Sequence, residues 1–516
     1  MLGLVSPTLA VLASFVPRVP QEAQESAPAG DRAVELTLEE AVRLAIERNL
    51  DLELEEITTA IAAYDARGSW GAFDPLLSLE AGYNQAEFQG TSSLSGGEVV
   101  EDDTFTLDSG LSWPLLTGGT FDVRYSHANE ETTNQFAAFD VSTTDVVTVG
   151  LTQPLLRGAW RRYATTVQRA AEIAHDRQKE REREIRQFLL LQVHQAYWDL
   201  VSAREVLGVS ELALHLGEEQ LAQDRRRLEV GTGTEVDVLQ SETNVAQQEE
   251  LHIQAELALR QAEDSLRRIV LEEEPVEGEA LSNWDLPIQP TTPLPEVGEA
   301  DDRVWEDWRS SLDVALERRP ILWQRRDDID AAEVDLQAAR SAKLPQLDLA
   351  LTSSSSGFDS DPSDARETAL GWDFPNNTAT LTFSLPLRNR TASFAERSAR
   401  AALRRARIAY EKAELDVLAE VRSAARDLRF ASESVIAAQK SAELARRQLE
   451  AETARQEIGL STTFQVLEFQ RDLAQALANV ATARATYAKA LAQRAHTEGR
   501  LDVSDVPAAD TARTGD

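Results

Sequence analysis

Two sets of polar side chains follow a glycine at matching intervals, and their spacing indicates hydrogen-bonding chemistry at helix ends. The sets are Gly231, Thr234, Asp237 and Gln240, and Gly459, Thr462, Gln465 and Glu468. Glycine just past a helix adopts φ > 0 at little cost, and threonine caps the start of the next helix. In a capping box, the side chain three residues after the cap bonds back to the cap's own backbone N–H. Both sets therefore predict tight reversals between antiparallel helices.

The sequence gives no sign of bond-making chemistry. The chain has no cysteine, which excludes disulfides, thiolate metal sites and cysteine nucleophiles. Its six histidines are scattered outside any recognisable metal-binding motif, so each is expected to be a solvated or seam residue. Nucleotide-binding, nucleophile-elbow and zinc-protease motifs are missing from the sequence. We predict no enzyme activity, no catalytic residues, no cofactor and no metal.

Charge and hydropathy limit the partners and the compartment. A net charge of -36 argues against binding to nucleic acid. Residues Leu2 to Val16 are mostly apolar and resemble the core of a signal peptide, although the first basic residue is only Arg18. No other run approaches the ~18 apolar residues of a spanning helix. We expect an exported protein.

The elements around the two glycines are written twice. At a shift of 228 residues, the seam from Val193 to Asp224 falls on the seam from Val421 to Glu452, in alternating steps of three and four. This is a heptad pattern, with larger apolar residues at one core position and small ones at the other. Small residues let neighbouring backbones approach closely, so the pattern predicts tightly packed helical hairpins.

The helices that lead into the glycines are predicted to be unusually long. They are expected over 163–230 and 393–458, each on the order of 100 Å, and the outgoing helices over 235–271 and 463–499. Such helices must bury their seams against other helices in a coiled-coil arrangement. At a different shift of 270 residues, Ala45 to Asn49 meets Ala315 to Arg319. The first copy therefore carries an extra segment among its strands.

Alternating segments between the helices predict strands of about nine residues or fewer. They are Leu77 to Gln85, Phe105 to Trp113, Phe121 to His127, Val146 to Gln153, Leu347 to Leu351 and Ala379 to Leu387. The alternation alone also fits a soluble antiparallel sheet with one dry face. The polar, Gly/Ser-rich segments Gln89 to Asp103 and Thr352 to Asp364 are expected to be long loops, as on the outer side of membrane barrels.

These features resemble the TolC-like outer-membrane efflux protein family, the outer membrane factors. The resemblance covers nearly all of residues 36 to 499, and the order of its motifs together with the duplication is specific. The motifs are Leu36 to Ala41 with Ala45 and Asn49, Gly71 to Pro75, Gln153 to Leu156, and Val230 to Gln240.

The resemblance implies an α+β membrane protein in which three protomers form an outer-membrane β-barrel. An antiparallel α-helical coiled-coil tunnel, built from two internal repeats per chain, continues the barrel across the periplasm. It implies passive conduction for efflux or type I secretion, with outer-membrane lipid, a periplasmic adaptor (membrane fusion) protein and an inner-membrane transporter as partners. The family usually has twelve strands in all, four per chain. The extra pair near Phe105 to His127 would make six, so it either enlarges the barrel or packs elsewhere, and the family number is the one we expect. The alternative is a coiled-coil periplasmic scaffold without a channel.

The resemblance also assigns roles at the tunnel tip. Adaptor docking falls to Val230, Gly231, Thr234, Ile458, Gly459 and Thr462, and the constriction to Asp237, Gln240, Gln465 and Glu468. Family members with a marked gate have Arg at the position of Ser461 and Asp at those of Gln465 and Glu468. This chain keeps an acid only at Glu468, with Asp237 in the other copy. A threefold ring of either acid would favour cations, whereas the plainer interpretation is an acid that complements a helix dipole.

The expected domains follow from these elements. They are a signal peptide and flexible start (1–30), a first repeat (31–271) with strands over 77–153 and a hairpin over 163–271, a linker around the tunnel (272–302), a second repeat (303–499) with strands over 347–387 and a hairpin over 393–499, and a flexible tail (500–516).

Overall fold

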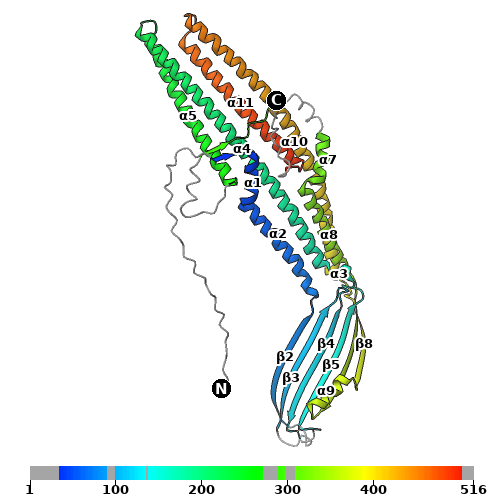
Figure 1. Ribbon diagram of the computed structural model, residues 1–516. Helices are drawn as coiled ribbons and strands as arrows, with labels where there is room; N and C mark the ends of the chain where they lie inside the picture. The colour runs from blue at the N-terminus through cyan, green and yellow to red at the C-terminus, as the bar shows by residue number, and fades with distance from the viewer. Residues whose placement is uncertain (1–33, 90–98, 135–136, 271–286, 298–307, 502–516) are drawn as a thin grey trace, which may run out of the picture.

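The structure is a computed structural model that describes residues 34–89, 99–134, 137–270, 287–297 and 308–501. The molecule is elongated, with a sheet at one end and two helical hairpins at the other (Figure 1). The predicted signal peptide, most of the predicted linker and the tail beyond Leu501 lie outside the described residues.

Four long helices form the two hairpins, and their ends lie within three residues of the predicted ones. They are α4 (Thr166–Glu229), α5 (Glu235–Val270), α10 (Arg390–Glu457) and α11 (Thr463–Thr497). The heptad residues bury themselves between them, since Ala442 and Ala445 of α10 pack with Leu473 and Ala476 of α11. The small side chains at these positions explain the close pairing of the helices.

Shorter helices lead into the sheet in two broken pairs. The first pair is α1 (Leu38–Arg48) and α2 (Leu50–Gly68), and the second is α7 (Trp308–Arg318) and α8 (Pro320–Lys343). The breaks fall at Asn49 and Arg319, whose extended backbones have ψ of 119° and 120°. A one-turn helix, α3 (Arg161–Ala164), and a 3-10 turn, η1 (Ser69–Phe73), join helices to strands.

A buried set of hydrogen bonds around Tyr197 joins distant segments near the middle of the molecule, and the sequence pattern did not indicate it. Strand β1 (Val34–Leu36) pairs in parallel with β6 (Ile288–Pro290). The fully buried Tyr197 hydroxyl donates to the Leu36 carbonyl at 3.0 Å and accepts from the Thr292 N–H at 3.0 Å. These contacts hold the chain between the hairpins against α4.

Six strands form one antiparallel sheet in the order β2-β3-β4-β5-β7-β8. They are β2 (Leu76–Gln89), β3 (Val99–Pro114), β4 (Thr120–Thr132), β5 (Val141–Pro154), β7 (Gln346–Asp359) and β8 (Pro375–Ser384). Strands β3 and β4, the pair that the first copy has in addition, therefore lie inside this sheet and do not pack elsewhere. All six are hydrogen-bonded neighbours.

The strands are also longer than predicted, at 10 to 16 residues. The loop expected over Thr352 to Asp364 is wrong, because Thr352 to Asp359 continue β7 and a helix, α9 (Pro362–Gly371), follows. Alternation fails there because α9 packs onto β7: a Cβ at Gly357 would lie 1.9 Å from the Ala365 carbonyl oxygen. Only small side chains fit, so an apolar pattern cannot mark the strand. Gln89 and Val99 to Asp103 likewise lie in strands.

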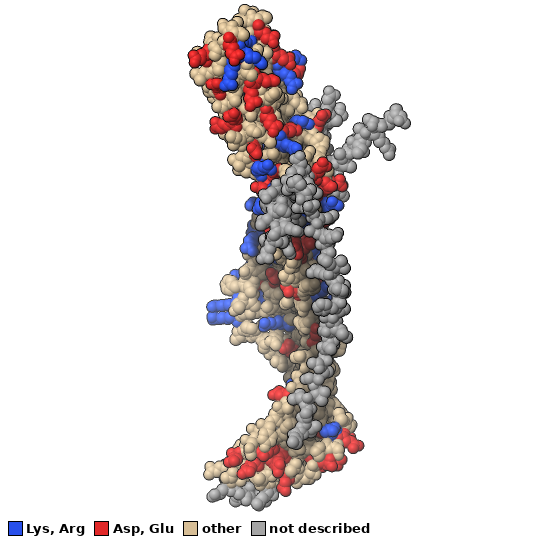
Figure 2. Space-filling view, turned by 60° about the vertical axis from the view of Figure 1, so that its left-hand side comes forward, with Lys and Arg blue, Asp and Glu red and all other residues tan. Residues whose placement is uncertain are grey.

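The surface differs between the two ends. Side chains of both charges cover the helical body, whereas the visible face of the sheet is largely uncharged near the helices and acidic at its far end (Figure 2). Within the described part of the chain, no helix is both long enough and apolar enough to cross a membrane.

The side chain of Asp327 on α8, which faces α4, is expected to destabilise the helices at neutral pH. Burial, aided by the carboxylates of Asp176, Asp330 and Glu180, raises the pKa of Asp327 to about 6. The pKa of Asp327 is higher in the folded state than in the unfolded state. Its favourable contribution to the free energy of unfolding is therefore fully present below about pH 4 and is lost as the pH rises through 6. Asp327→Asn should therefore stabilise the protein at pH 8 by about 1 kcal/mol after solvent screening, with no gain at pH 4. Thermal unfolding at both pH values measures this.

The exposed Asp335 on the same helix supplies the control. Asp335→Asn should leave the midpoint unchanged at both pH values. A gain for Asp327→Asn that is equal at pH 4 and pH 8 would contradict the electrostatic explanation.

Candidate functional site

The two turns at the tip have the same backbone geometry. Gly231 and Gly459 adopt φ of 75° and 76°. The Gly231 N–H donates to the Leu228 carbonyl at 3.0 Å, and the next N–H, from Thr232, donates to the Arg227 carbonyl at 2.8 Å. Gly459 and Leu460 repeat these two bonds at 3.0 and 2.8 Å. This is the Schellman arrangement, which satisfies carbonyls that the helix end leaves unpaired.

Both predicted capping boxes form. The Thr234 N–H donates to Asp237 Oδ2 at 3.0 Å, and the Asp237 N–H donates to Thr234 Oγ1 at 3.3 Å. In the second turn, the Gln465 N–H donates to Thr462 Oγ1 at 3.4 Å and the Gln465 side chain answers the Thr462 N–H. The side chains of Asp237 and Gln465 therefore cap the starts of α5 and α11.

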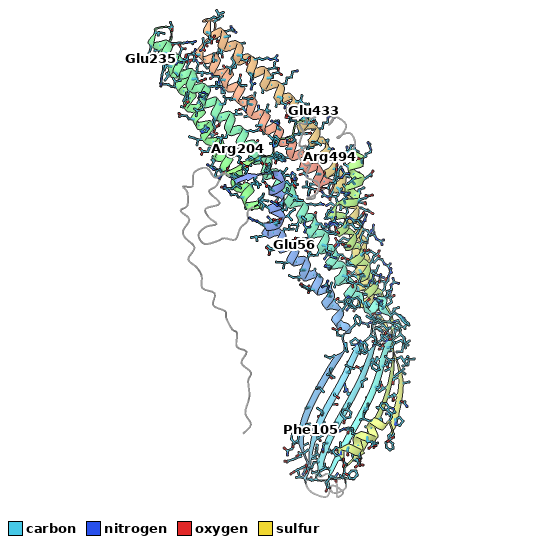
Figure 3. All side chains as sticks on the ribbon, in the orientation of Figure 1. Glu56, Phe105, Arg204, Glu235, Glu433 and Arg494 are labelled. Atoms are coloured by element: carbon cyan, nitrogen blue, oxygen red, sulfur yellow. The ribbon has the colours of Figure 1, made fainter. Side chains whose placement is uncertain are left out.

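The structure places all the predicted site residues at the tip, at the far end from the sheet (Figure 3, where Glu235 marks the first turn). Val230 and Ile458 are 73% and 71% exposed. Glu468 is also exposed, one turn further along α11, and no hydrogen bond or ion pair to it is found among the described residues. The residues predicted for docking and those predicted for the constriction thus lie at the same end of the molecule, and Glu468 is an acid there that takes part in neither capping box.

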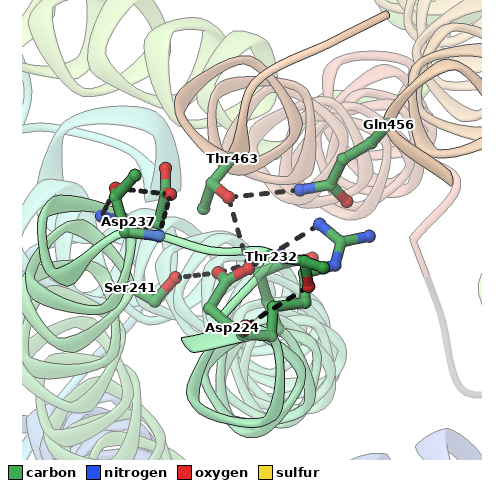
Figure 4. Close-up of polar contacts among 9 residues, drawn as sticks. Asp224, Thr232, Asp237, Ser241, Gln456 and Thr463 are labelled. Carbon is green, nitrogen blue, oxygen red and sulfur yellow. Dashed lines mark hydrogen bonds and ion pairs between the residues drawn. The ribbon is translucent and has the colours of Figure 1, made fainter. Parts of the chain in front are cut away.

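A buried polar cluster beneath the turns joins the two hairpins (Figure 4). Its centre is Asp224 of α4, which is 2% exposed. Asp224 accepts hydrogen bonds from Ser241 of α5 at 2.7 Å and from Thr463 of α11 at 3.3 Å. Gln220 donates to it at 3.0 Å, and Gln456 of α10 donates to Thr463 at 3.3 Å. All four long helices therefore contribute to this cluster.

The equivalent acid in the second copy stays within its own hairpin. Glu452 is 6% exposed, lies 3.3 Å from the Arg455 guanidinium and accepts a short hydrogen bond from Ser461 in the adjoining turn. Arg227 stands in the matching place near Asp224, at 3.9 Å. The two tips thus share a buried acid and a nearby arginine, but only Asp224 reaches the other hairpin.

The site residues that sequence reasoning missed are Asp224, Glu452, Thr463 and Gln456. Asp224 and Glu452 were visible as acids at heptad positions that are otherwise apolar or small. An acid at a buried seam position must find partners, because an unpaired buried charge is costly. That signal could have marked both acids, although their partners could not be read from the pattern. Among the described residues, no group of three or more His, Asp or Glu side chains is arranged to hold a metal ion.

Long paired helical hairpins that lead into a six-stranded antiparallel sheet define a protein of TolC-like channel architecture. Two solved outer-membrane channels match it: OprN, with a TM-score of 0.64 and 15% identity over 90% of this chain and 89% of that one, and CmeC of Campylobacter jejuni, with 0.63 and 17% over 90% and 87%. At these identities the likeness shows the fold alone.

The model of the family described as outer membrane efflux protein matches residues 129–270 and 311–494. The chain belongs to this family, and it is an outer-membrane protein. It is 25% identical over 388 residues to the outer membrane efflux protein BepC of Brucella suis, covering 74% of this chain and 76% of that one. It is 27% identical over 235 residues to the proteases secretion protein PrtF of Dickeya chrysanthemi, where the match spans 45% of this chain and 47% of PrtF.

Proposed function

We propose that the chain is the outer-membrane channel of a tripartite efflux or type I secretion system. Three copies form a β-barrel in the outer membrane and a coiled-coil tunnel in the periplasm, each copy contributing two repeats. The tunnel conducts substrate passively, and an inner-membrane transporter coupled through a periplasmic adaptor supplies the energy. The observation that carries the proposal is the family match across both halves of the chain, at residues 129–270 and 311–494.

An exposed helical seam supports the homotrimer. Residues of α2 at steps of three, four and three are all exposed: Leu54, Ile57, Ile61 and Tyr64. This is the spacing of a coiled-coil seam. Large apolar side chains in such a continuous stripe need a partner helix, because a monomer would leave them in water. A second copy of the chain is the partner that we propose.

Exposed apolar residues at the tip support adaptor docking. Val230 and Ile458 project from the two turns, beside Gly231, Thr234, Gly459 and Thr462. Apolar side chains rimmed by polar ones are typical of protein contact sites. Asp237, Gln240, Gln465 and Glu468 begin the outgoing helices next to this surface, where threefold symmetry would form a ring from each of them. We assign docking to the first group and the constriction to the second.

Fractionation and conductance test the proposed function. The protein should be extracted from the outer membrane only by detergent, run as a trimer in native mass spectrometry, and form conducting pores in planar lipid bilayers. Recovery as a soluble monomer would overturn the proposal in favour of a scaffold.

Removing the apolar tip side chains should uncouple the channel from its partners. The double variant Val230→Ser, Ile458→Ser is expected to lower export in cells at least tenfold, because each lost apolar contact at a docking centre costs about 1–2 kcal/mol. Single-channel conductance of the purified variant should be unchanged. Glu235→Gln, an exposed change at the same tip, is the control and should export normally. Equal export by the double variant and the wild type would argue against docking at this surface.

A further inference from the structure

Strands β3 and β4, the pair that the first copy has in addition to its other two strands, lie in the middle of the sheet. Strand β3 is paired with β2 from Leu76–Ser112 to Gln89–Val99, and with β4 over thirteen residues on its other edge. Strand β4 is in turn paired with β5 over twelve residues. A hairpin folded into the interior of a channel would leave β2 and β5 as neighbours. Here β3 and β4 separate them.

Side chains alternate in the same sense across all six strands. One face carries rows of directly opposed apolar side chains near the helices: Leu77, Leu111, Val123 and Val149, a row that ends on Ser353 and Asn377, and next to it Trp113, Phe121, Leu151 and Leu351. The other face carries Ser78, Arg124, Thr148, Ser354 and Asn376 in one register row. The apolar face suits lipid and the polar face suits water. Strands β3 and β4 follow this division as the other strands do.

Helix α9 lies on the apolar face, so it does not obstruct the polar one. Gly357 points to the apolar face, in register with Asp145, and is the residue on which Ala365 of α9 rests. Arg366 Nε donates to the Tyr125 hydroxyl at 3.3 Å, and that hydroxyl donates to the buried Asp145 at 2.9 Å. These contacts fix α9 at the far end of β5 and β7, on the face opposite to the polar one.

The sheet has two open edges that match each other. Among the described residues, β2 and β8 each have a strand partner on one side only. Six strands are fewer than the eight of the smallest membrane barrels, and open edges are not tolerated in lipid. Because the sheet is antiparallel throughout and has an even number of strands, β8 of one copy runs antiparallel to β2 of the next. The geometry allows closure by copies of this chain.

We propose that β2 of each copy pairs with β8 of the next, so that three copies close a wall of eighteen strands with the polar face inside. The inference rests on the proposed homotrimer. Barrel diameter grows roughly linearly with strand number, so this wall is about 1.5 times as wide as the twelve-stranded one that the family resemblance implies. Barrels of this size hold an aqueous channel. Control over the size of the transported substrate would then belong to the helical tip.

Cysteine labelling tests whether the extra pair is wall, with no background because the chain has no cysteine. Leu111 and Ser112 are adjacent on β3 and face opposite sides. In trimers reconstituted into lipid vesicles, Ser112→Cys should react with a charged, membrane-impermeant thiol reagent at least tenfold faster than Leu111→Cys. Both should label fully after denaturation. Equal rates, or the reverse order, would overturn the proposal.

Crosslinking tests the closure between copies. Leu79→Cys on β2 is combined in turn with Ala379→Cys, Leu381→Cys or Phe383→Cys on β8, because the neighbouring copy sets the register. Oxidation should give covalent trimers for at least one pair, and none for the control Leu79→Cys with Val149→Cys. Trimers that crosslink with no pair, or that show twelve strands by cryo-electron microscopy, overturn this inference alone. A soluble monomer overturns the proposed function instead.

Discussion

Replacing Asp224 with alanine is expected to separate the two hairpins at the tip and to lower the local opening free energy there by about 2–4 kcal/mol. The carboxylate accepts from Ser241, Gln220 and Thr463 in a site that is 2% exposed. Removing it leaves three buried donors without their acceptor. The bond from Thr463 is the one that crosses between hairpins, so its loss should also raise single-channel conductance.

Amide hydrogen exchange measures this effect directly. Protection of the backbone amides should fall in α4, α5 and the first turn of α11, while the amides around Tyr197 stay protected. Asp224→Asn keeps one carbonyl acceptor, so it should lower the local opening free energy by roughly half as much as Asp224→Ala. Glu452→Gln is the matched change in the second copy, and its effect should stay within α10 and the turn after it. Loss of protection in both hairpins from Glu452→Gln would count against the special role of Asp224.

Neutralising Glu468 is expected to reduce the cation preference of the open channel several-fold, and neutralising Asp237 to change it less. A ring of three exposed carboxylates would set a negative potential at the constriction. Asp237 already accepts two hydrogen bonds from Thr234, at 3.0 Å from its N–H and 2.6 Å from its hydroxyl. Its charge is therefore partly offset by the cap and by the helix N-terminus.

Reversal potentials in asymmetric salt compare Glu468→Gln with Asp237→Asn. Asp237→Asn should instead weaken the start of α5, by about 0.5–2 kcal/mol as for a lost cap. Gln240→Ala, which changes no charge, is the control for both. Equal shifts in reversal potential from the two acids would contradict the hypothesis that one turn chiefly docks and the other constricts.

The turn chemistry and helix limits could be predicted because they depend on contacts within a few residues. Gly231 needs only its own φ and the carbonyls of the preceding turn, and Thr462 bonds within three residues of itself. The heptad seam likewise repeats locally, so helix ends were placed to within three residues. The predicted range of strand β7 is too short because α9 packs against the outer part of this strand. Its contact with Gly357 requires small side chains there, so the apolar alternation is missing.

By itself, then, the sequence determined the doubled hairpins, the caps at Thr234 and Thr462, and the resemblance that led to the family. Only the tertiary structure decided which strands are neighbours and what Asp224 does. Asp224 and Thr463 lie 239 positions apart, and the order of six strands depends on pairings such as β5 with β7, from Thr143 with Asp359 to Pro154 with Asp348. Local sequence preferences carry no information about contacts between residues so far apart, because such contacts form only when packing brings distant segments together.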